Sequence, residues 1–244
     1  MKLLLQVLLP LLLCAALSGR AAGNLDRTRL IAYEADNSVS VLLTNQSNAL
    51  PYLAHAWVEN AAGDKDASAF MALPPIQRLE PQGNSQVRLV RQPGAAALPA
   101  DRESLFYFNV REVPPKATQR NVMQMAIQSR IKLFYRPAAI ATLPAVPWQE
   151  RLQVTRSAAA LTLSNPSPYF ITVGFVGHRA QPGIKDFAGV MVPPFGTVSA
   201  AAGGSLHPVF LIGYINDYGA LKMLRVNCAA ASPCDVKPDN GEAP

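Results

Sequence analysis

The chain has 244 residues, of which half are hydrophobic and 16% are charged, and Lys and Arg exceed Asp and Glu by 22 to 16. This apolar content excludes an intrinsically disordered chain. Three cysteines are too few for a mini-protein stapled by disulfides. The 21 prolines and the 7% aromatic content disfavour a helix bundle and favour short strands joined by turns.

Residues 1–22 have the layout of a secretory signal peptide. Lys2 precedes an apolar stretch from Leu3 to Leu17, and small residues follow it. The stretch is shorter than the ~20 residues that a spanning helix needs, and Pro10 interrupts it. We therefore expect export, cleavage near residue 22 and a mature chain that is not embedded in a membrane. A lipoprotein signal at Cys14 is the alternative that this segment leaves open.

Removal of the signal changes both the cysteine count and the charge. The mature chain keeps Cys228 and Cys234, together with 20 basic and 16 acidic residues. Two cysteines in an oxidising compartment are expected to form a disulfide, with two free thiols or a metal site as the alternatives. The basic residues are dispersed over both halves of the chain, without a stripe of basic and aromatic residues, and this argues against a nucleic-acid partner.

Alternation of apolar and polar residues runs through most of the remaining chain and predicts β-strands. The predicted strands cover residues 38–44, 52–58, 86–90, 105–110, 121–135, 152–155, 161–163, 169–173, 190–192, 210–215 and 224–226. Residues 137–147 contain three prolines and are typical of a linker. The sequence therefore predicts an all-β protein with two sandwich domains, residues 23–140 and 141–238.

The residues needed for catalysis do not form a recognisable pattern. His55, His178 and His207 are widely spaced and match no metal-binding motif. The chain has no nucleophile elbow, phosphate loop or dinucleotide fingerprint. We therefore predict that the protein is not an enzyme and takes no cofactor and no metal.

Three segments are more specific than a generic sandwich. In Leu98–Pro115, a charged turn leads into an aromatic strand that ends at a double proline; residues 121–135 carry an apolar row; and Tyr214–Gly219 combines a strand with a tight turn. Together with Leu25–Arg29 and Gln77–Pro81, these segments resemble the periplasmic chaperones of the chaperone–usher pilus pathway. The resemblance covers nearly the whole mature chain.

This resemblance implies two immunoglobulin-like domains in a boomerang arrangement and a periplasmic location. It also implies a chaperone that binds pilin subunits and the tip adhesin and delivers them to the outer-membrane usher. A pilin lacks the last strand of its sandwich, and the chaperone would lend residues 121–135 by donor-strand complementation. When free, such a chaperone is expected to self-associate through this edge strand. The alternative is an exported two-domain adhesin or structural surface protein, which needs no free strand.

The resemblance also assigns roles to individual residues. The side chains expected to fill the subunit groove are those of Met123, Met125 and Ile127. Pattern alone would place this apolar row in the chain's own core. The cations expected to hold the subunit's C-terminal carboxylate are Arg29 and Lys132.

A third set belongs to the junction of the two domains. The residues that match the family's inter-domain salt bridge are Glu103, Arg136 and Asp217. Their expected role is to orient the domains, and the sequence does not indicate whether the bridge is buried.

Overall fold

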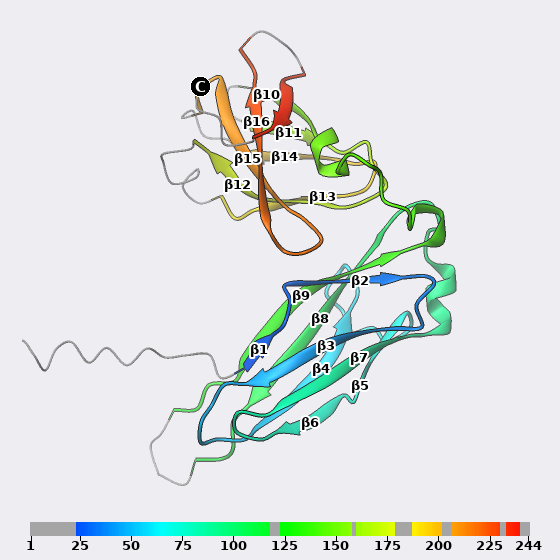
Figure 1. The fold of residues 1–244 in the computed structure, drawn as a ribbon, viewed down its shortest axis with the longest axis vertical. Coiled ribbons are helices and arrows are strands. Elements are labelled where there is room, and N and C mark those ends of the chain that lie inside the picture. The colour runs from blue at the N-terminus through cyan, green and yellow to red at the C-terminus, as the bar shows by residue number, and fades with distance from the viewer. Residues whose placement is uncertain are drawn as a thin grey trace, which may run out of the picture.

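A computed structural model of the protein describes residues 23–117, 123–157, 160–178, 187–201, 206–229 and 233–239. Two groups of strands, joined by a linker, lie at an angle to each other (Figure 1). The helices in the described ranges are short 3-10 turns, namely η2 (Pro93–Ala97), η3 (Ala138–Ile140) and η4 (Trp148–Arg151). In this part of the chain no helix is long and apolar enough to cross a membrane. The predicted signal peptide, residues 1–22, lies outside the described residues.

The first domain is a sandwich of two sheets. One sheet has the order β1 (Gly23–Leu25), β3 (Ser38–Asn45), β7 (Asn84–Arg91) and β5 (Phe70–Leu73). The other has the order β2 (Arg29–Tyr33), β9 (Ile127–Arg136), β8 (Ser104–Val113), β4 (Tyr52–Glu59) and β6 (Ile76–Leu79). Side chains of alternate residues meet between the sheets, and among them Val87, Phe108 and Leu133 are completely buried.

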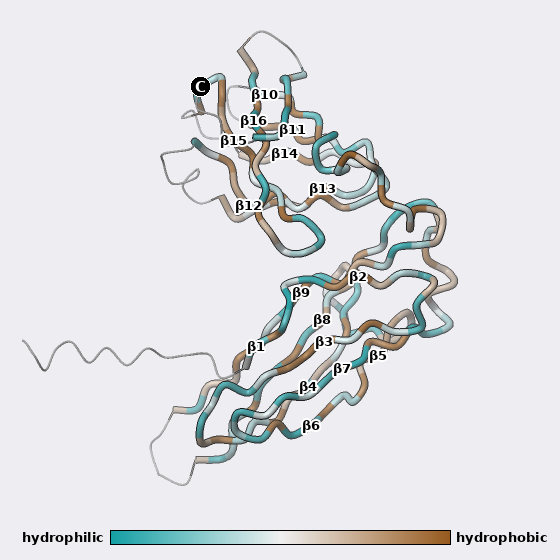
Figure 2. The backbone as a smooth tube through the Cα atoms, in the orientation of Figure 1, coloured by the Kyte–Doolittle hydropathy of each residue, from teal (hydrophilic) through white to brown (hydrophobic). Residues whose placement is uncertain are grey.

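The second domain repeats this architecture with its own core. Its smaller sheet has the order β10 (Gln153–Arg156), β11 (Ala160–Ser164) and β14 (Thr197–Ala201). Its larger sheet has the order β13 (Val190–Val192), β12 (Ile171–Gly177), β15 (Val209–Ile215), β16 (Leu221–Asn227) and β17 (Asp235–Pro238). Figure 2 shows apolar and polar residues alternating along the strands of both domains. The predicted all-β fold with two sandwiches is confirmed.

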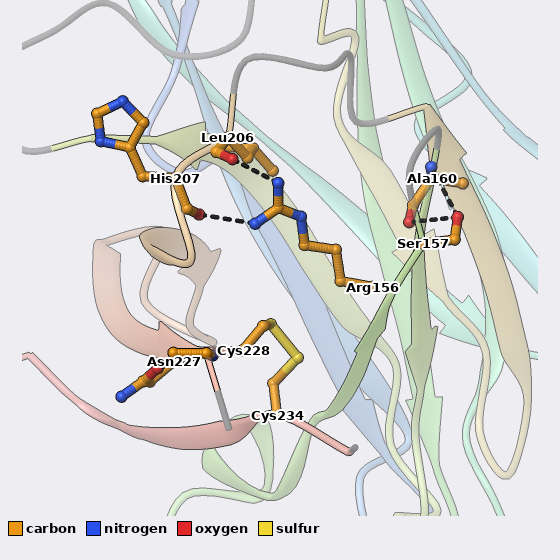
Figure 3. The surroundings of a disulfide bond; sticks show 9 residues. Arg156, Ser157, Ala160, Leu206, His207, Asn227, Cys228 and Cys234 are labelled. Atoms are coloured by element: carbon orange, nitrogen blue, oxygen red, sulfur yellow. Dashed lines mark hydrogen bonds between the residues drawn. A yellow bond between two sulfur atoms is a disulfide. The ribbon is translucent and has the colours of Figure 1, made fainter. Parts of the chain in front are cut away.

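The predicted disulfide is present. Cys228 follows β16, Cys234 precedes β17, and their sulfur atoms are 2.03 Å apart (Figure 3). The bond joins the ends of two neighbouring strands at the edge of the larger sheet. It therefore ties the end of β16 to the start of β17 (Figure 3).

A buried asparagine marks the same place in each domain. Asn45 ends β3 and Asn165 follows β11, and each donates from its amide nitrogen to three backbone carbonyls. Each also accepts at Oδ1 from the backbone N–H of a serine two residues later, Ser47 or Ser167. The two domains thus share an internal structural repeat that the sequence pattern does not reveal.

The long predicted strand, residues 121–135, is shorter in the structure. It begins at Ile127 as β9, while residues 123–126 lie outside any strand and residues 121 and 122 lie outside the described residues. The cause lies in its partner, because β8 ends at Val113 and is followed by Pro114 and a second proline. Proline has no N–H to donate to a neighbouring strand. Among the described residues, residues 123–126 therefore have no strand partner within their own domain.

Candidate functional site

Part of one edge of β9 is free. On one side β9 pairs with β8 along residues 127–135, but on the other side β2 pairs in parallel only with residues 132–136. Within the described residues, the second edge of residues 127–131 has no strand partner. Such an edge presents unpaired N–H and C=O groups and is a template for pairing with another chain. This edge is the first element of the site.

The apolar row that continues along this edge is divided between two environments. Leu133 and Tyr135 point into the core of the first domain, and Ile131 packs against it. Before the first residue of β9, Met123 and Met125 are 86% and 73% exposed. Ile127 begins the strand and is also exposed. The apolar residues of this segment therefore serve the chain's own core at one end and are open to solvent at the other.

Two cations lie next to the free edge. Arg29 on β2 and Lys132 on β9 are direct partners in the parallel register. Arg29 donates from Nη1 to the Ile215 carbonyl at 3.1 Å, and Lys132 donates from Nζ to Thr172 Oγ1 at 3.2 Å. Both acceptors belong to the second domain, and neither is an acid. The Nε atom of Arg29 is buried and has no hydrogen-bond partner among the described residues.

Electrostatics make this pair of cations receptive to an anion. Burial, with the nearby charge of Arg29, lowers the pKa of Lys132 to about 8. Burial also lowers the pKa of Arg29, although Asp217 and Glu103 act in the opposite direction. Two partly desolvated positive charges side by side favour a negative group that can accept from both. A carboxylate, which has two acceptor oxygens, suits this corner of the structure.

The three residues predicted for the domain junction lie in contact. Arg136 is fully buried and donates from Nε and Nη2 to Glu103 Oε1, at 2.9 Å and 2.7 Å. Its Nη2 also lies 3.0 Å from Asp217 Oδ2, and the Asp217 side chain is 20% exposed. Although burial disfavours the charge of Arg136, the two carboxylates outweigh this effect and raise the pKa of the guanidinium. Asp217 belongs to the second domain, so this bridge spans the junction.

Aromatic residues complete the junction, and the sequence analysis does not anticipate them. The guanidinium of Arg136 lies within 5.0–5.4 Å of three ring centres, those of Tyr33, Trp148 and Tyr169. The second carboxylate oxygen of Glu103 accepts from the Phe170 backbone N–H at 2.8 Å. Aromatic residues near a linker are common, and only their convergence on one arginine distinguishes these three.

The acceptors of Arg29 and Lys132 in the second domain are likewise not evident from the sequence. Thr172 lies within an apolar run, where a hydroxyl gives little signal. The Ile215 group involved is a backbone carbonyl, which every residue carries. Neither contact could be found without the arrangement of the two domains.

A two-domain sandwich with a free strand edge beside two cations is suited to bind another protein chain by strand addition. Residues 23–141 match the family of the pili and flagellar-assembly chaperone, PapD N-terminal domain. Residues 147–225 match the family of the pili assembly chaperone PapD, C-terminal domain. The chain belongs to the family of pili assembly chaperones. The predicted resemblance is thereby confirmed.

Individual relatives are similar over almost their full length. The chain is 45% identical over 225 residues to the fimbrial chaperone YbgP of Escherichia coli K12, covering 91% of this chain and 93% of the relative. It is 41% identical over 238 residues to the chaperone protein PapD of Escherichia coli, covering 97% and 98%. These relatives are fimbrial chaperones rather than adhesins, which favours the main interpretation of the sequence over its alternative.

Solved structures of chaperones have the same fold. The periplasmic chaperone SfaE is 34% identical with a TM-score of 0.66, covering 83% of this chain and 98% of SfaE. A chain of the Salmonella enterica complex between the SafA pilin and the SafB chaperone is 26% identical with a TM-score of 0.73, covering 85% and 97%. The latter structure contains a chaperone together with its pilin.

Proposed function

We propose that this protein is an exported pilus-assembly chaperone that captures a pilin subunit along the free edge of β9 and holds the subunit's C-terminal carboxylate between Arg29 and Lys132. The observation that carries the proposal is the unpaired edge of residues 127–131 beside the buried Arg29 and the half-buried Lys132, whose hydrogen bonds within the described residues go to a carbonyl and a hydroxyl and not to an acid. Main-chain hydrogen bonds along this edge would provide a grip that does not depend on the subunit's sequence.

The side chains of the exposed row fit the role of groove contacts. Strand addition places alternate residues of the donated segment in the acceptor's core. Met123, Met125 and Ile127 are alternate residues, lie on one face and are exposed in the free chain. Methionine is long and flexible, so these residues suit grooves that differ in shape between subunits.

The cations Arg29 and Lys132, here called the anchor, would set the register of this pairing. Lys132 lies five positions after Ile127 and seven after Met125, so it occupies the opposite face of the same segment. A carboxylate fixed at Lys132 therefore leaves the apolar row directed at the groove. A slip by one residue would reverse the faces and turn the row towards solvent.

The inter-domain bridge has a supporting role in this proposal. Glu103, Arg136 and Asp217 lie away from the free edge and orient the second domain, which carries the acceptors Thr172 and Ile215. Their contribution to subunit capture is indirect.

Further partners and the location follow from the family. Relatives of known structure include a periplasmic chaperone and a chaperone bound to a pilin. We extend this to periplasmic export through residues 1–22, to binding of the tip adhesin and to delivery of subunits to the outer-membrane usher. The free chaperone would protect its edge by self-association. The protein would act without catalysis and without a cofactor.

Co-purification with a pilin subunit tests the proposal. The intact chain is co-expressed with the pilin of the same gene cluster, and the complex is isolated from the periplasm. Ile127→Asp should abolish capture because it buries an unpaired charge in the groove. Leu42→Asp is a matched control, since Leu42 is 40% exposed and Ile127 is 41% exposed, but Leu42 lies on the other sheet. Equal capture by both variants would exclude the edge of β9 as the binding site.

A further inference from the structure

The last residue of β15 and the turn that follows it contact the first domain at three points. The Ile215 carbonyl accepts from Arg29, Asp217 accepts from Arg136, and Gly219 lies against Thr28. In Figure 1 the β15–β16 hairpin extends from the second domain towards β2, which carries Arg29. This end of the hairpin therefore touches both Arg29 and the residue before it, Thr28.

Gly219 permits this close approach. Its φ of +83° is a conformation that residues with a side chain rarely adopt. A β-carbon at this position would lie 2.5 Å from Thr28 Oγ1. Since this distance is well below van der Waals contact, an alanine at position 219 would displace either the turn or Thr28. Thr28 is bonded directly to Arg29, so the displacement would reach the anchor.

The contact with Ile215 determines how Arg29 faces a ligand. A guanidinium has five N–H groups in a planar fork, and it can bind a carboxylate through two of them on one edge. The Ile215 carbonyl occupies Nη1, while Nε is buried without a partner among the described residues. The edge formed by Nε and Nη2 is therefore the one left for a carboxylate.

We propose that the Asn216–Gly219 turn of the second domain positions Arg29 for the subunit's carboxylate, and that Gly219 and Thr28 are positioning residues of the anchor. This inference rests on the proposed function, because it assigns a role within the same anion site. It means that the anchor is complete only when the two domains are docked through this turn. The strength of carboxylate binding then depends on two residues that do not touch the ligand.

The first domain contains a turn with the same construction. In both turns an asparagine side chain accepts from two backbone N–H groups, those two and four residues later, and its carbonyl accepts from a glycine three residues later. The second turn is Asn60–Gly63, where Gly63 has a φ of +95°. A β-carbon on Gly63 would lie 3.7 Å from the Nη2 atom of Arg130, which is an ordinary van der Waals contact. Gly63→Ala therefore causes the same backbone strain without the contact to the other domain.

Binding of two synthetic peptides tests the proposal. Both are fluorescent peptides of alternating valine and serine; one has a free C-terminal carboxylate and the other a C-terminal amide. The contribution of Arg29 and Lys132 is measured by a ratio of dissociation constants for the intact chaperone. This ratio is the dissociation constant of the amidated peptide divided by that of the carboxylate peptide. Gly219→Ala should reduce this ratio about tenfold, the effect of losing one charge-assisted hydrogen bond. Gly63→Ala should leave the ratio unchanged.

A second substitution separates the contact with Thr28 from backbone strain. Thr28→Ala removes the hydroxyl that the new methyl group would strike, so the Thr28→Ala, Gly219→Ala double variant should recover most of the lost ratio. An unchanged ratio in Gly219→Ala, an equal loss in Gly63→Ala, or a double variant no better than Gly219→Ala would each overturn the proposal.

Arg29→Ala distinguishes a failure of this inference from a failure of the proposed function. If Arg29→Ala lowers the ratio and Gly219→Ala does not, the anchor is real and the turn does not position it. If Arg29→Ala also leaves the ratio unchanged, the carboxylate anchor itself is wrong, and the role of the turn is wrong with it.

Discussion

Arg29 and Lys132 are direct partners in the parallel pairing of β2 and β9, and each donates a hydrogen bond to the second domain. The first domain supplies the charges, whereas Ile215 and Thr172 of the second domain fix their direction. Their present acceptors, a carbonyl and a hydroxyl, carry no charge. A carboxylate that accepts from both cations would supply a negative charge beside them. The proposed anion site thus depends on both domains, although its cations come from one.

The affinity for a free carboxylate should depend on pH. Lys132 has a pKa of about 8 in the free chain, and a bound carboxylate favours the protonated form and raises this pKa. Between about pH 5, where the C-terminal carboxyl group of the peptide is ionised, and about pH 7, binding should therefore be independent of pH. Above about pH 8 it should weaken, by at most about tenfold per pH unit. Fluorescence titrations with the carboxylate peptide would measure this. Lys132→Arg, which stays charged, should flatten the decline, and a flat wild-type profile up to about pH 10 would contradict the prediction.

Removal of either cation should weaken capture without unfolding the protein. Arg29→Ala and Lys132→Ala should each cost about 1.5–3 kcal/mol of binding free energy, roughly a 10- to 100-fold rise in Kd. Because burial lowers the pKa of both groups, their charges do not stabilise the folded chain. The melting temperature should therefore remain near that of the wild type. The amidated peptide is the control, and it should bind the variants and the wild type alike.

The sequence predicts the sandwich architecture well because alternation is a local property. The row that includes Met125 and Leu133 shows where this signal ends. Both residues belong to one run of alternating apolar and polar residues, yet Leu133 is buried and Met125 is exposed. Their difference depends on where β8 ends and where β2 begins to pair, which no alternation pattern contains. Only the resemblance to the family directs attention to Met125.

The sequence does not reveal the strand β2 or the aromatic rings around Arg136, because both depend on contacts between distant segments. The strand β2 is five residues long and pairs with β9 about a hundred positions later, so its run carries little signal of its own. The cage of Tyr33, Trp148 and Tyr169 around Arg136 combines residues from both domains. The family pattern identifies the bridge formed by charged residues, whereas the rings around it become visible only when the domains are docked.

A charge in the exposed row should abolish capture and leave the chaperone's own stability unchanged. Met125→Asp would bury an unpaired carboxylate in the subunit groove, which costs several kcal/mol of binding free energy. In the free chain Met125 is exposed, so the free energy of unfolding should change by less than about 0.5 kcal/mol. Co-purification and urea denaturation measure the two effects separately.

Leu133→Ala provides the opposite case in the same run of residues. Leu133 is fully buried, so the substitution should lower the free energy of unfolding by about 2–5 kcal/mol. A comparable loss of stability in Met125→Asp would place the outer row in the chain's own core and would contradict its role in the groove.

Within the inter-domain bridge, a substitution at Glu103 should lower the free energy of unfolding more than a substitution at Asp217. Glu103→Ala leaves the fully buried Arg136 without its principal partner, and breaking such a pair costs about 3–5 kcal/mol. Asp217→Asn should cost less, because its side chain is partly exposed and the amide oxygen can still accept from Arg136. Chain unfolding by urea would compare the two variants with Arg130→Ala, which breaks the more exposed pair with Glu59.

Tryptophan fluorescence can assign this loss to the junction. The chain has two tryptophans, and Trp148 lies against Arg136, whereas Trp57 lies on β4 of the first domain. In a Trp57→Phe background the emission therefore comes from Trp148, which lies against Arg136 at the junction and packs in the core of the second domain. Glu103→Ala should shift this emission at a urea concentration below the one that unfolds the first domain. The substitution removes both carboxylate oxygens, so Arg136 and the Phe170 N–H each lose an acceptor. Coincident transitions would show that the bridge stabilises the whole chain instead of the angle between its domains.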